Sequence, residues 1–446
     1  MTGVQTCALP IYFGAGYYQQ KGLLLGQQYE RLNLRSSMDM EASKYIKVGY
    51  SATLSGFRTM DAPSVFYSAY TAPPVFKPMV NDSTYTDPVG LGLGNFGNPS
   101  ASLEYYNSQS NGFRLVGSVF TEISFLKHFQ FRSQYGVDMG YARNRSYTPY
   151  HIVSSVQKDT NRTLRRQWTY DYKSVWDNTL TFETQTGSHR IKAMAGMAAQ
   201  LETNLGTYGS RLGVPYLGDH TLYLNLGRAK TSDVGDWGSK ITALSYFGRT
   251  NYSFRDKYLF TATLRFDGSS TFPREDRWDI FPSAGLGWIL TGEDFMKGQS
   301  FVDFLKLRAS WGLNGNNRIP ANVYTLTVEQ GGVLNTGFGQ GGTIVIYEGA
   351  NITSAVPPTL LWEKMHEIDI ALEGTSFNNR LSFEIDLYWR TTQDAIFPLT
   401  LSATSGTSGS YLSNNADILN RGIELTLGWA DKVGKFGYNL NLNYAY

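Results

Sequence analysis

The sequence predicts an all-β protein: part of a large antiparallel transmembrane β-barrel, with about 15 of about 22 strands present and both ends missing. Three observations predict it. Apolar and polar residues alternate with a period of two over most of the chain from Tyr12 onward. Many of these segments run for about ten residues or more, as strands that cross a membrane at a tilt must. The connections between them alternate between short and mostly long.

The clearest alternation runs from Leu381 to Arg390, where five apolar residues alternate with Ser, Glu, Asp, Tyr and Arg. Successive side chains of a strand point to opposite faces, so this strand has one apolar and one charged face. The same pattern occurs at 129–139, 258–267, 305–311 and 438–444. Each of these segments is therefore predicted to be a strand with unlike faces.

Aromatic residues tend to stand near the ends of these strands. Two such rows, one at each membrane interface, are typical of transmembrane barrels. Aromatic residues that cap the core of a soluble β-sandwich would give a related pattern, so that alternative stays open. The residues concerned are Tyr246, Phe254, Tyr258, Phe266, Trp389, Trp429, Tyr438 and Tyr444.

The connections give the stronger argument. Short turns are expected near 41–44, 126–128, 185–188, 255–257, 374–379 and 430–435, with a medium connection at 291–303 in the same series. Between them lie long connections at 56–111, 142–167, 202–240, 268–279, 314–361 and 392–419. A meander places every second connection at the same end, and transmembrane barrels have short periplasmic turns and long extracellular loops.

Composition excludes several classes. The chain has 446 residues and a net charge of +2, from 39 Lys+Arg against 37 Asp+Glu, so it has no broad basic field for nucleic acid. Charged residues are 17%, and no apolar run reaches the length of a membrane helix, about 18 residues. The many Tyr, Phe and Gly fit a barrel, and they also fit a secreted all-β binding protein.

The first eleven residues contain Cys7 and read as the translation of a sequencing-library adapter. They lack the basic start and long apolar core of a signal peptide. We therefore expect residues 1–11 to be an artefact and assign residues 12–446 to one partial barrel, with no plug domain and no C-terminal strands.

No pattern points to an enzyme, a metal or a cofactor. Gly92–Gly97 spells the dinucleotide-binding fingerprint, but prolines flank it and no helical period is expected after it, so a surface loop is predicted. The five histidines are scattered, and no zinc, serine-hydrolase or phosphate-loop motif is present. Carboxylates two residues apart, such as Glu384 and Asp386 or Glu367 and Asp369, are predicted to form a water-facing wall rather than an acid/base pair.

Several separate motifs resemble one family. They include Leu244–Tyr252, Asp256–Ser270, Arg277–Trp288, Glu293–Met296, Leu305–Asn317, Leu361–Lys364 and Asn420–Leu425, and, earlier in the chain, Gly16–Tyr18, Gly22–Leu24 and Tyr29–Arg31. In this order they resemble the barrel of SusC/RagA-type TonB-dependent transporters of Bacteroidetes. Members of that family carry a signal peptide, a TonB box and a plug ahead of the barrel. We expect a chain that lacks those parts and ends within the meander to form no stable transporter, because open strand edges are costly in lipid.

The resemblance implies a multi-pass protein of the Gram-negative outer membrane that imports an oligosaccharide or a peptide. It implies a SusD-like surface lipoprotein as a lid and TonB as the energy source. Lumen-facing candidates, which would contact substrate, pair with the plug or simply be hydrated, are Arg249, Arg265, Asp267, Arg308, Glu384 and Asp386. Loop aromatics that could stack on sugars, or more simply pack, are Tyr67, Tyr70, Phe76 and Tyr85. A non-transporting outer-membrane barrel, for adhesion or signalling, and a secreted binding protein are the alternatives.

Overall fold

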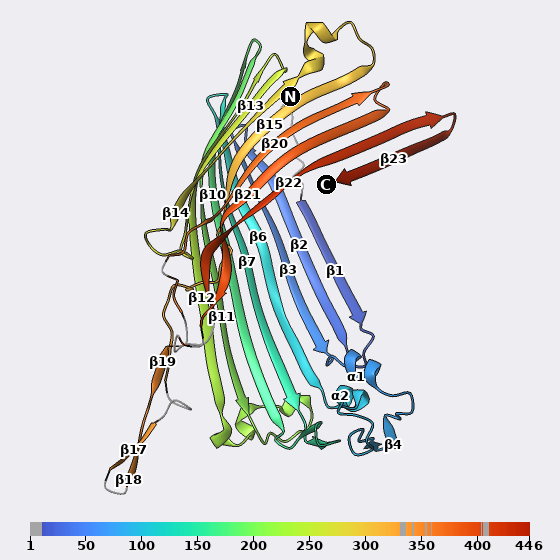
Figure 1. Ribbon diagram of the computed structural model, residues 1–446, viewed down its shortest axis with the longest axis vertical. Helices are drawn as coiled ribbons and strands as arrows, with labels where there is room; N and C mark the ends of the chain where they lie inside the picture. Colours follow the sequence, from blue (N-terminus) through green and yellow to red (C-terminus); the bar gives the residue numbers. More distant parts are fainter. Residues whose placement is uncertain are drawn as a thin grey trace, which may run out of the picture. The chain divides into compact units, whose positions relative to one another are not determined.

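The computed structural model describes residues 11–330, 336–340, 343–352, 355–357, 359–402, 404 and 410–446. The expectation about residues 1–11 lies outside the described residues except for Ile11. Within the described part, 15 strands form one sheet, as predicted, and each strand pairs with the strands of this sheet that precede and follow it along the chain (Figure 1).

The strands of this sheet follow one another in sequence order. They are β1 (Ile11–Lys21), β2 (Gln28–Ser43), β3 (Ile46–Asp61), β6 (Asn107–Phe125), β7 (Phe129–Thr148), β10 (Thr163–Thr186), β11 (His189–Arg211), β12 (Asp233–Phe254), β13 (Tyr258–Ser269), β14 (Trp278–Ile289), β15 (Val302–Asn316), β20 (Glu363–Ser376), β21 (Leu381–Thr400), β22 (Ser410–Val433) and β23 (Phe436–Ala445).

The connections contain small elements of their own. Two short helices, α1 (Phe66–Thr71) and α2 (Pro99–Glu104), follow β3, together with a hairpin of β4 (Met79–Asn81) and β5 (Thr84–Tyr85). The other hairpins pair β8 (His151–Ile152) with β9 (Lys158–Asp159), β16 (Val328–Gln330) with β19 (Ala350–Ile352), and β17 (Thr336–Gln340) with β18 (Thr343–Tyr347). Single 3-10 turns are η1 (Asp219–Thr221), η2 (Leu224–Leu226), η3 (Ala229–Thr231), η4 (Leu290–Gly292) and η5 (Asp294–Met296).

The short turns lie where the sequence predicts them. Residues 126–128 join β6 to β7, and residues 255–257 join β12 to β13. Leu126 and Lys127 have φ of 49° and 61°, and Arg255 and Asp256 have φ of 55° and 53°. Two successive residues with positive φ give the backbone twist of tight hairpins. The opposite connections are shorter than predicted, because the strands continue in pairs beyond their alternating segments.

One expectation about the loops is wrong. A helix does begin after the Gly92–Gly97 segment: Asn98 caps α2, and its side chain accepts hydrogen bonds from the backbone amides of Ser100 and Ala101. Six residues are too few for a helical period to show in the sequence. The strand that precedes the segment, β5, has only two residues, and a turn lies between β5 and the segment. A dinucleotide-binding fold needs a full strand that leads directly into the glycine motif, so the motif does not have that setting here.

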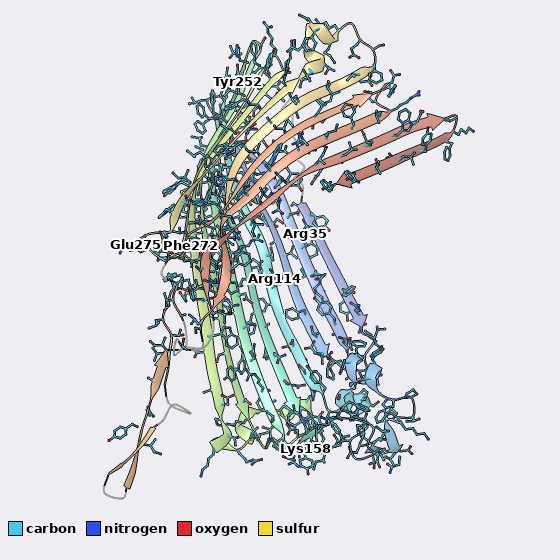
Figure 2. All side chains as sticks on the ribbon, viewed as in Figure 1. Arg35, Arg114, Lys158, Tyr252, Phe272 and Glu275 are labelled. Carbon is cyan, nitrogen blue, oxygen red and sulfur yellow. The ribbon has the colours of Figure 1, made fainter. Side chains whose placement is uncertain are left out.

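Contacts divide the chain into two compact units. The second unit comprises Glu122–Ser133, Trp176–Gln200 and Ile241–Tyr446, and the first unit comprises the remainder. Each unit has a small apolar core among its connections rather than beneath its sheet. Tyr147, Leu164, Val214 and Leu222 form the core of the first unit, and Phe272, Phe281, Ile319, Leu360 and Trp362 that of the second. Figure 2 places Tyr252 near the short turn that ends β12, and Phe272 beyond the opposite end of β13.

Among the described helices, none combines the length and the apolar character that crossing a membrane would need.

Candidate functional site: a polar wall on the second unit

The pairing register carries all six predicted lumen-facing residues onto one face of the sheet. Residues paired directly across neighbouring strands share a face, and every second residue of a strand returns to it. One such row runs from Arg249 through Thr263, Ser283, Gly312 and Glu367 to Arg390. A parallel row joins Arg308 to Ala371, Asp386 and Glu424. We call this face the polar wall; its charged residues include Arg249, Arg265, Asp267, Asp279, Lys306, Arg308, Glu367, Asp369, Glu373, Glu384, Asp386, Arg390 and Glu424.

The opposite face is apolar and open. Leu264, Leu286 and Leu442 are 55%, 62% and 57% exposed, although each is a large aliphatic side chain in the interior of a strand. Exposure of this kind over a whole face is unusual for a protein in water and is expected where lipid covers the face. Other members of the face are Phe260, Trp311, Ile368, Ile370, Leu387, Trp389, Leu425 and Leu440.

Aromatic rings mark two levels of the apolar face. At the short turns, Phe254 lies 6.2 Å from Tyr258, and Phe377 lies 4.8 Å from Phe301 and 5.9 Å from Trp429. Eight residues along β13 from Tyr258, the second level begins at Phe266, whose ring stacks on Trp278 at 4.6 Å. Eight residues span about 26 Å of strand, which matches the apolar band of about 25 Å in transmembrane barrels.

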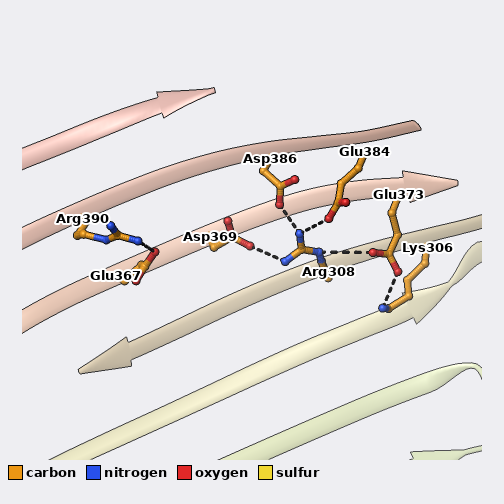
Figure 3. A network of polar contacts seen from close by, with 8 residues as sticks. All are labelled: Lys306, Arg308, Glu367, Asp369, Glu373, Glu384, Asp386 and Arg390. Atoms are coloured by element: carbon orange, nitrogen blue, oxygen red, sulfur yellow. Dashed lines mark hydrogen bonds and ion pairs between the residues drawn. The ribbon is translucent and has the colours of Figure 1, made fainter. Parts of the chain in front are cut away.

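Arg308 is the centre of the polar wall (Figure 3). Its guanidinium lies 3.0 Å from Asp369, 3.7 Å from Glu373 and 2.7 Å from Glu384, and it also contacts Asp386. The carboxylates come from β20 and β21, so one side chain of β15 connects three strands. Lys306 lies 2.7 Å from Glu373, which it shares with Arg308, and Arg390 forms a separate pair with Glu367 at 2.7 Å. The eight residues drawn in Figure 3 comprise three basic and five acidic side chains, so the network carries an excess of negative charge.

The other three predicted residues lie apart from this network. Arg265 and Asp267 pair with each other at 2.9 Å, and the guanidinium of Arg265 stands 5.1 Å from the ring centre of Phe247. Arg249 makes one long hydrogen bond to Asn251, at 3.4 Å, and forms no ion pair within the described residues. The candidates are therefore one cluster, one pair and one isolated cation.

A hollow of about 910 Å³ on the polar wall brings Arg249 into the same space as the Arg308 cluster. Its lining includes Arg249, Arg308, Asp386, Arg390 and Glu424. Sequence reasoning did not name Arg390, Glu424 or Lys306 as candidates. The signal that could have found them is the one that found the others, since each occupies a polar-face position of an alternating strand.

The loop aromatics divide into two kinds. Phe76 packs against Phe96 at 5.5 Å, and Tyr85 against Tyr105 at 5.7 Å, so these two serve the loop's own packing. Tyr67 and Tyr70 on α1 are 79% and 89% exposed. Of the four loop residues singled out in the sequence, these two are free to contact another molecule.

In the described part of the chain, no three His, Cys, Asp or Glu side chains are arranged so that they could hold a metal ion.

The comparisons with known proteins agree with this geometry. The family model described as "TonB dependent receptor-like, beta-barrel" matches residues 45–446. TonB-dependent receptor P26 of Formosa agariphila is 28% identical over 427 residues, which cover 93% of this chain and 41% of that protein. TonB-dependent receptor SusC of Bacteroides thetaiotaomicron is 27% identical over 352 residues, covering 78% of this chain and 34% of that protein.

Among solved structures, the RagAB peptide importer in its closed-closed state superposes with a TM-score of 0.82 at 21% identity, over 98% of this chain and 48% of that chain. This likeness establishes the shared fold. The chain spans about two fifths of the length of the first curated relatives it matches.

The resemblance to the SusC/RagA type is thereby confirmed. The matched relatives are receptors and transporters rather than enzymes, and their family is an outer-membrane family that works with TonB. This chain belongs to the TonB-dependent receptor β-barrel family.

Proposed function

We propose that this chain supplies barrel wall and extracellular loops to a TonB-dependent importer of the outer membrane, and that its polar wall lines the path of a nutrient. The observation that carries the proposal is the division of the sheet into a charged face and an open apolar face. A wall with lipid on one side and water on the other requires this division along every strand. A secreted all-β protein would bury its apolar face instead.

The substrate is proposed to be an oligosaccharide or a peptide. RagAB, which shares this fold, is a peptide importer, and a peptide is one of the two cargo classes proposed here for the polar wall. Carboxylates and guanidinium groups together offer donors and acceptors both to hydroxyl groups and to the main chain of a peptide. Tyr67 and Tyr70 present ring faces suited to sugar stacking or to a docked protein.

The partners are proposed to be TonB, which the family uses, and a SusD-like surface lipoprotein that covers the conduit. The long connections of the first unit would be its docking side, because their ordered base leaves α1 exposed. Asn98 is fully buried in that base and donates to the carbonyl oxygens of Pro78 and Thr86. Gln157, from the β7–β10 connection, donates in turn to the carbonyl oxygen of Asn98 at 3.1 Å.

The first test asks which face meets lipid. Thr263 and Leu264 are neighbours on β13 that point to opposite faces, so they form a matched pair for single cysteine substitutions in the full gene product, with its own cysteines replaced by serine. In membranes, a cysteine at Thr263 should react with a water-soluble maleimide, and one at Leu264 should react only with a lipid-soluble reagent. Equal reactivity of both sites with the water-soluble reagent would overturn the proposal.

The second test asks about transport. Deletion of the gene should abolish growth on one class of oligosaccharide or peptide, and the intact gene should restore it. Restoration should fail when the cell lacks TonB. Normal growth of the deletion strain on every such nutrient, although the parent strain carries the protein in its outer membrane, would favour the adhesion or signalling alternative.

A further inference from the structure

The ladder between β14 and β15 stops before either strand ends. The two strands pair from Ile289 opposite Lys306 as far as Ser283 opposite Gly312. Beyond that point β14 remains paired only to β13, and β15 continues to Asn316 paired only to β20. Pro282 stands where the ladder ends, and its ring nitrogen has no hydrogen to donate. The sheet therefore divides into the end of β14 (278–282) and a second piece, here called the tip, formed by 313–316 of β15 and 363–366 of β20, of which 364–366 remain paired with 391–393 of β21.

The tip and the end of β14 overlap instead of lying side by side. Gly315 pairs directly with Lys364, and both belong to the apolar face, because Gly315 is three residues from Gly312 of the polar wall. Asp279 and Phe281 belong to the polar face of β14, since they lie four and two residues from Ser283. Contacts between unlike faces mean that one layer lies over the other.

Two contacts of this kind are present. The ammonium group of Lys364 lies 2.7 Å from the carboxylate of Asp279. The ring of Phe281 fills the space beside Gly315, where an added Cβ would stand 2.1 Å from the ring. The apolar face of the tip therefore rests on the polar face of β14.

A small core seals the overlap. Phe272 and Leu360 are fully buried, and Phe281 and Trp362 are 5% exposed. Trp362, which stands just before β20, stacks on Phe272 with ring centres 4.7 Å apart, and its ring centre lies 5.3 Å from that of Phe281 in a tilted arrangement. Its indole N–H donates to the carbonyl oxygen of Arg277 at 3.1 Å. Every contact across the overlap is made by side chains or loops, and no β14–β15 ladder bond crosses it.

We propose that the tip is a flap folded over the polar face of β14, where it narrows the opening of the conduit, and that Gly315 and the Lys364–Asp279 pair latch it. The inference rests on the proposed function, because it takes the polar face as the lining of the conduit. Release of the flap breaks side-chain contacts and leaves the β14–β15 ladder intact. The hinge then lies at Gly312, where that ladder ends.

The test uses the full gene product in detergent or nanodiscs. Gly315→Val should push the tip away from Phe281, since the new side chain and the ring cannot share the space. Amide hydrogen exchange at 313–316 and 363–366 should then accelerate roughly tenfold or more, while 305–310 stays protected. Gly437→Val on β23 is the matched control, because a Cβ there meets nothing within 4 Å.

A second variant avoids steric strain. Lys364→Gln removes the ion pair with little change in volume and should raise exchange in the same two segments, by a smaller factor. The charge-exchanged double variant Asp279→Lys/Lys364→Asp should restore protection. Double electron–electron resonance measures the distance between spin labels at Gln393 and Thr263. In Gly315→Val this distance should lengthen or its distribution should broaden, whereas the distance between control labels at Thr261 and Thr426 should not change.

The flap proposal would be overturned if amide hydrogen exchange at 313–316 and 363–366 were unchanged in both Gly315→Val and Lys364→Gln. It would also be overturned if exchange accelerated equally at 305–310. If a cysteine at Thr263 faces lipid, the proposed function fails, although an exchange result for the overlap would still stand. If Thr263 faces water and the exchange is unchanged, the flap alone fails.

Discussion

Arg308 in the second unit and Arg114 in the first both pair with carboxylates on nearby strands, but the number of carboxylates differs. Arg114 on β6 makes two parallel hydrogen bonds to Asp138 on β7, at 2.7 and 2.5 Å, and its side chain is 62% exposed (Figure 2). Arg308 is 32% exposed and serves four carboxylates on two strands. A pair of equal and opposite charges is neutral by itself, and its loss leaves one hydrated group. A cation shared by four acids holds together groups that would otherwise repel one another.

The largest effect is expected from Arg308→Met. Four carboxylates would lose their common counter-ion, and the unfolding free energy should fall by about 2–3 kcal/mol, toward the lower end for buried pairs because Arg308 is partly hydrated. Urea unfolding of the reconstituted full gene product measures it. Arg249→Met, which removes a cation without an ion pair in the described residues, should change stability by less than about 0.5 kcal/mol. Equal losses in the two variants would refute the difference drawn between these sites.

Neutralising two of the four carboxylates should then recover part of the unfolding free energy that Arg308→Met loses. Adding Glu384→Gln and Asp386→Asn to Arg308→Met removes two of the repelling charges and should recover about 1–2 kcal/mol. The same two changes in the wild-type protein should destabilise it, because Arg308 then loses two partners. Rescue is the outcome that a purely steric role for Arg308 does not predict.

Arg114→Met should cost less than about 1 kcal/mol, the usual range for exposed ion pairs. Its contribution should also weaken at high salt, because the pair is accessible to screening ions. Unfolding of wild type and variant at low and at about 1 M ionic strength measures both effects. A loss as large as that of Arg308→Met would show that the number of shared acids does not set the difference.

The smallest effect concerns a loop. Asp219 in the β11–β12 connection accepts hydrogen bonds from Asn107 at 2.8 Å and from Arg145 at 2.9 Å. Burial opposes ionisation of Asp219, but these bonds outweigh it and hold the pKa of its carboxyl below the ordinary 3.8. The carboxylate therefore stabilises the loop above pH 3.8, and this stabilisation is lost as the pH falls through the lower folded value. Proteolysis of residues 212–232 should increase with acid in wild type, and Asp219→Asn should show no such dependence.

Alternation along single strands was enough to predict about 15 strands and to place all six candidate residues on one face of the sheet, and that this face lines a lumen stays a prediction. The signal arises because lipid on one face and water on the other impose opposite demands on neighbouring residues. It fades toward one end of the longest strands: β12 begins at Asp233 and β22 at Ser410, well before the segments whose alternation marks them. In these end segments both faces of the strand can be polar. The strand is then held only by backbone hydrogen bonds to its neighbours, which leave no alternating pattern in the sequence.

Sequence reasoning also could not reveal which charges meet. Arg308 and Asp386 are 78 residues apart and come together only through the register of β15, β20 and β21. The overlap at Gly315 could not be predicted for a similar reason. A glycine in a strand does not indicate which side chain fills the space beside it, which here is the ring of Phe281. Long-range juxtaposition of this kind follows from the register of several strands, which no single segment encodes.

The strict neighbour-to-neighbour order of the sheet has a kinetic consequence. Most strands meet a partner that is only a tight turn away, so closing each hairpin restricts a short length of chain. Assembly can then advance one hairpin at a time, each new strand covering the exposed edge of the last. The slow steps should be the two longest closures, across residues 62–106 and 317–362, where β6 must find β3 and β20 must find β15. During those pauses the leading strand edge stays open, which makes β3 and β15 the points at which a nascent chain is most vulnerable to aggregation.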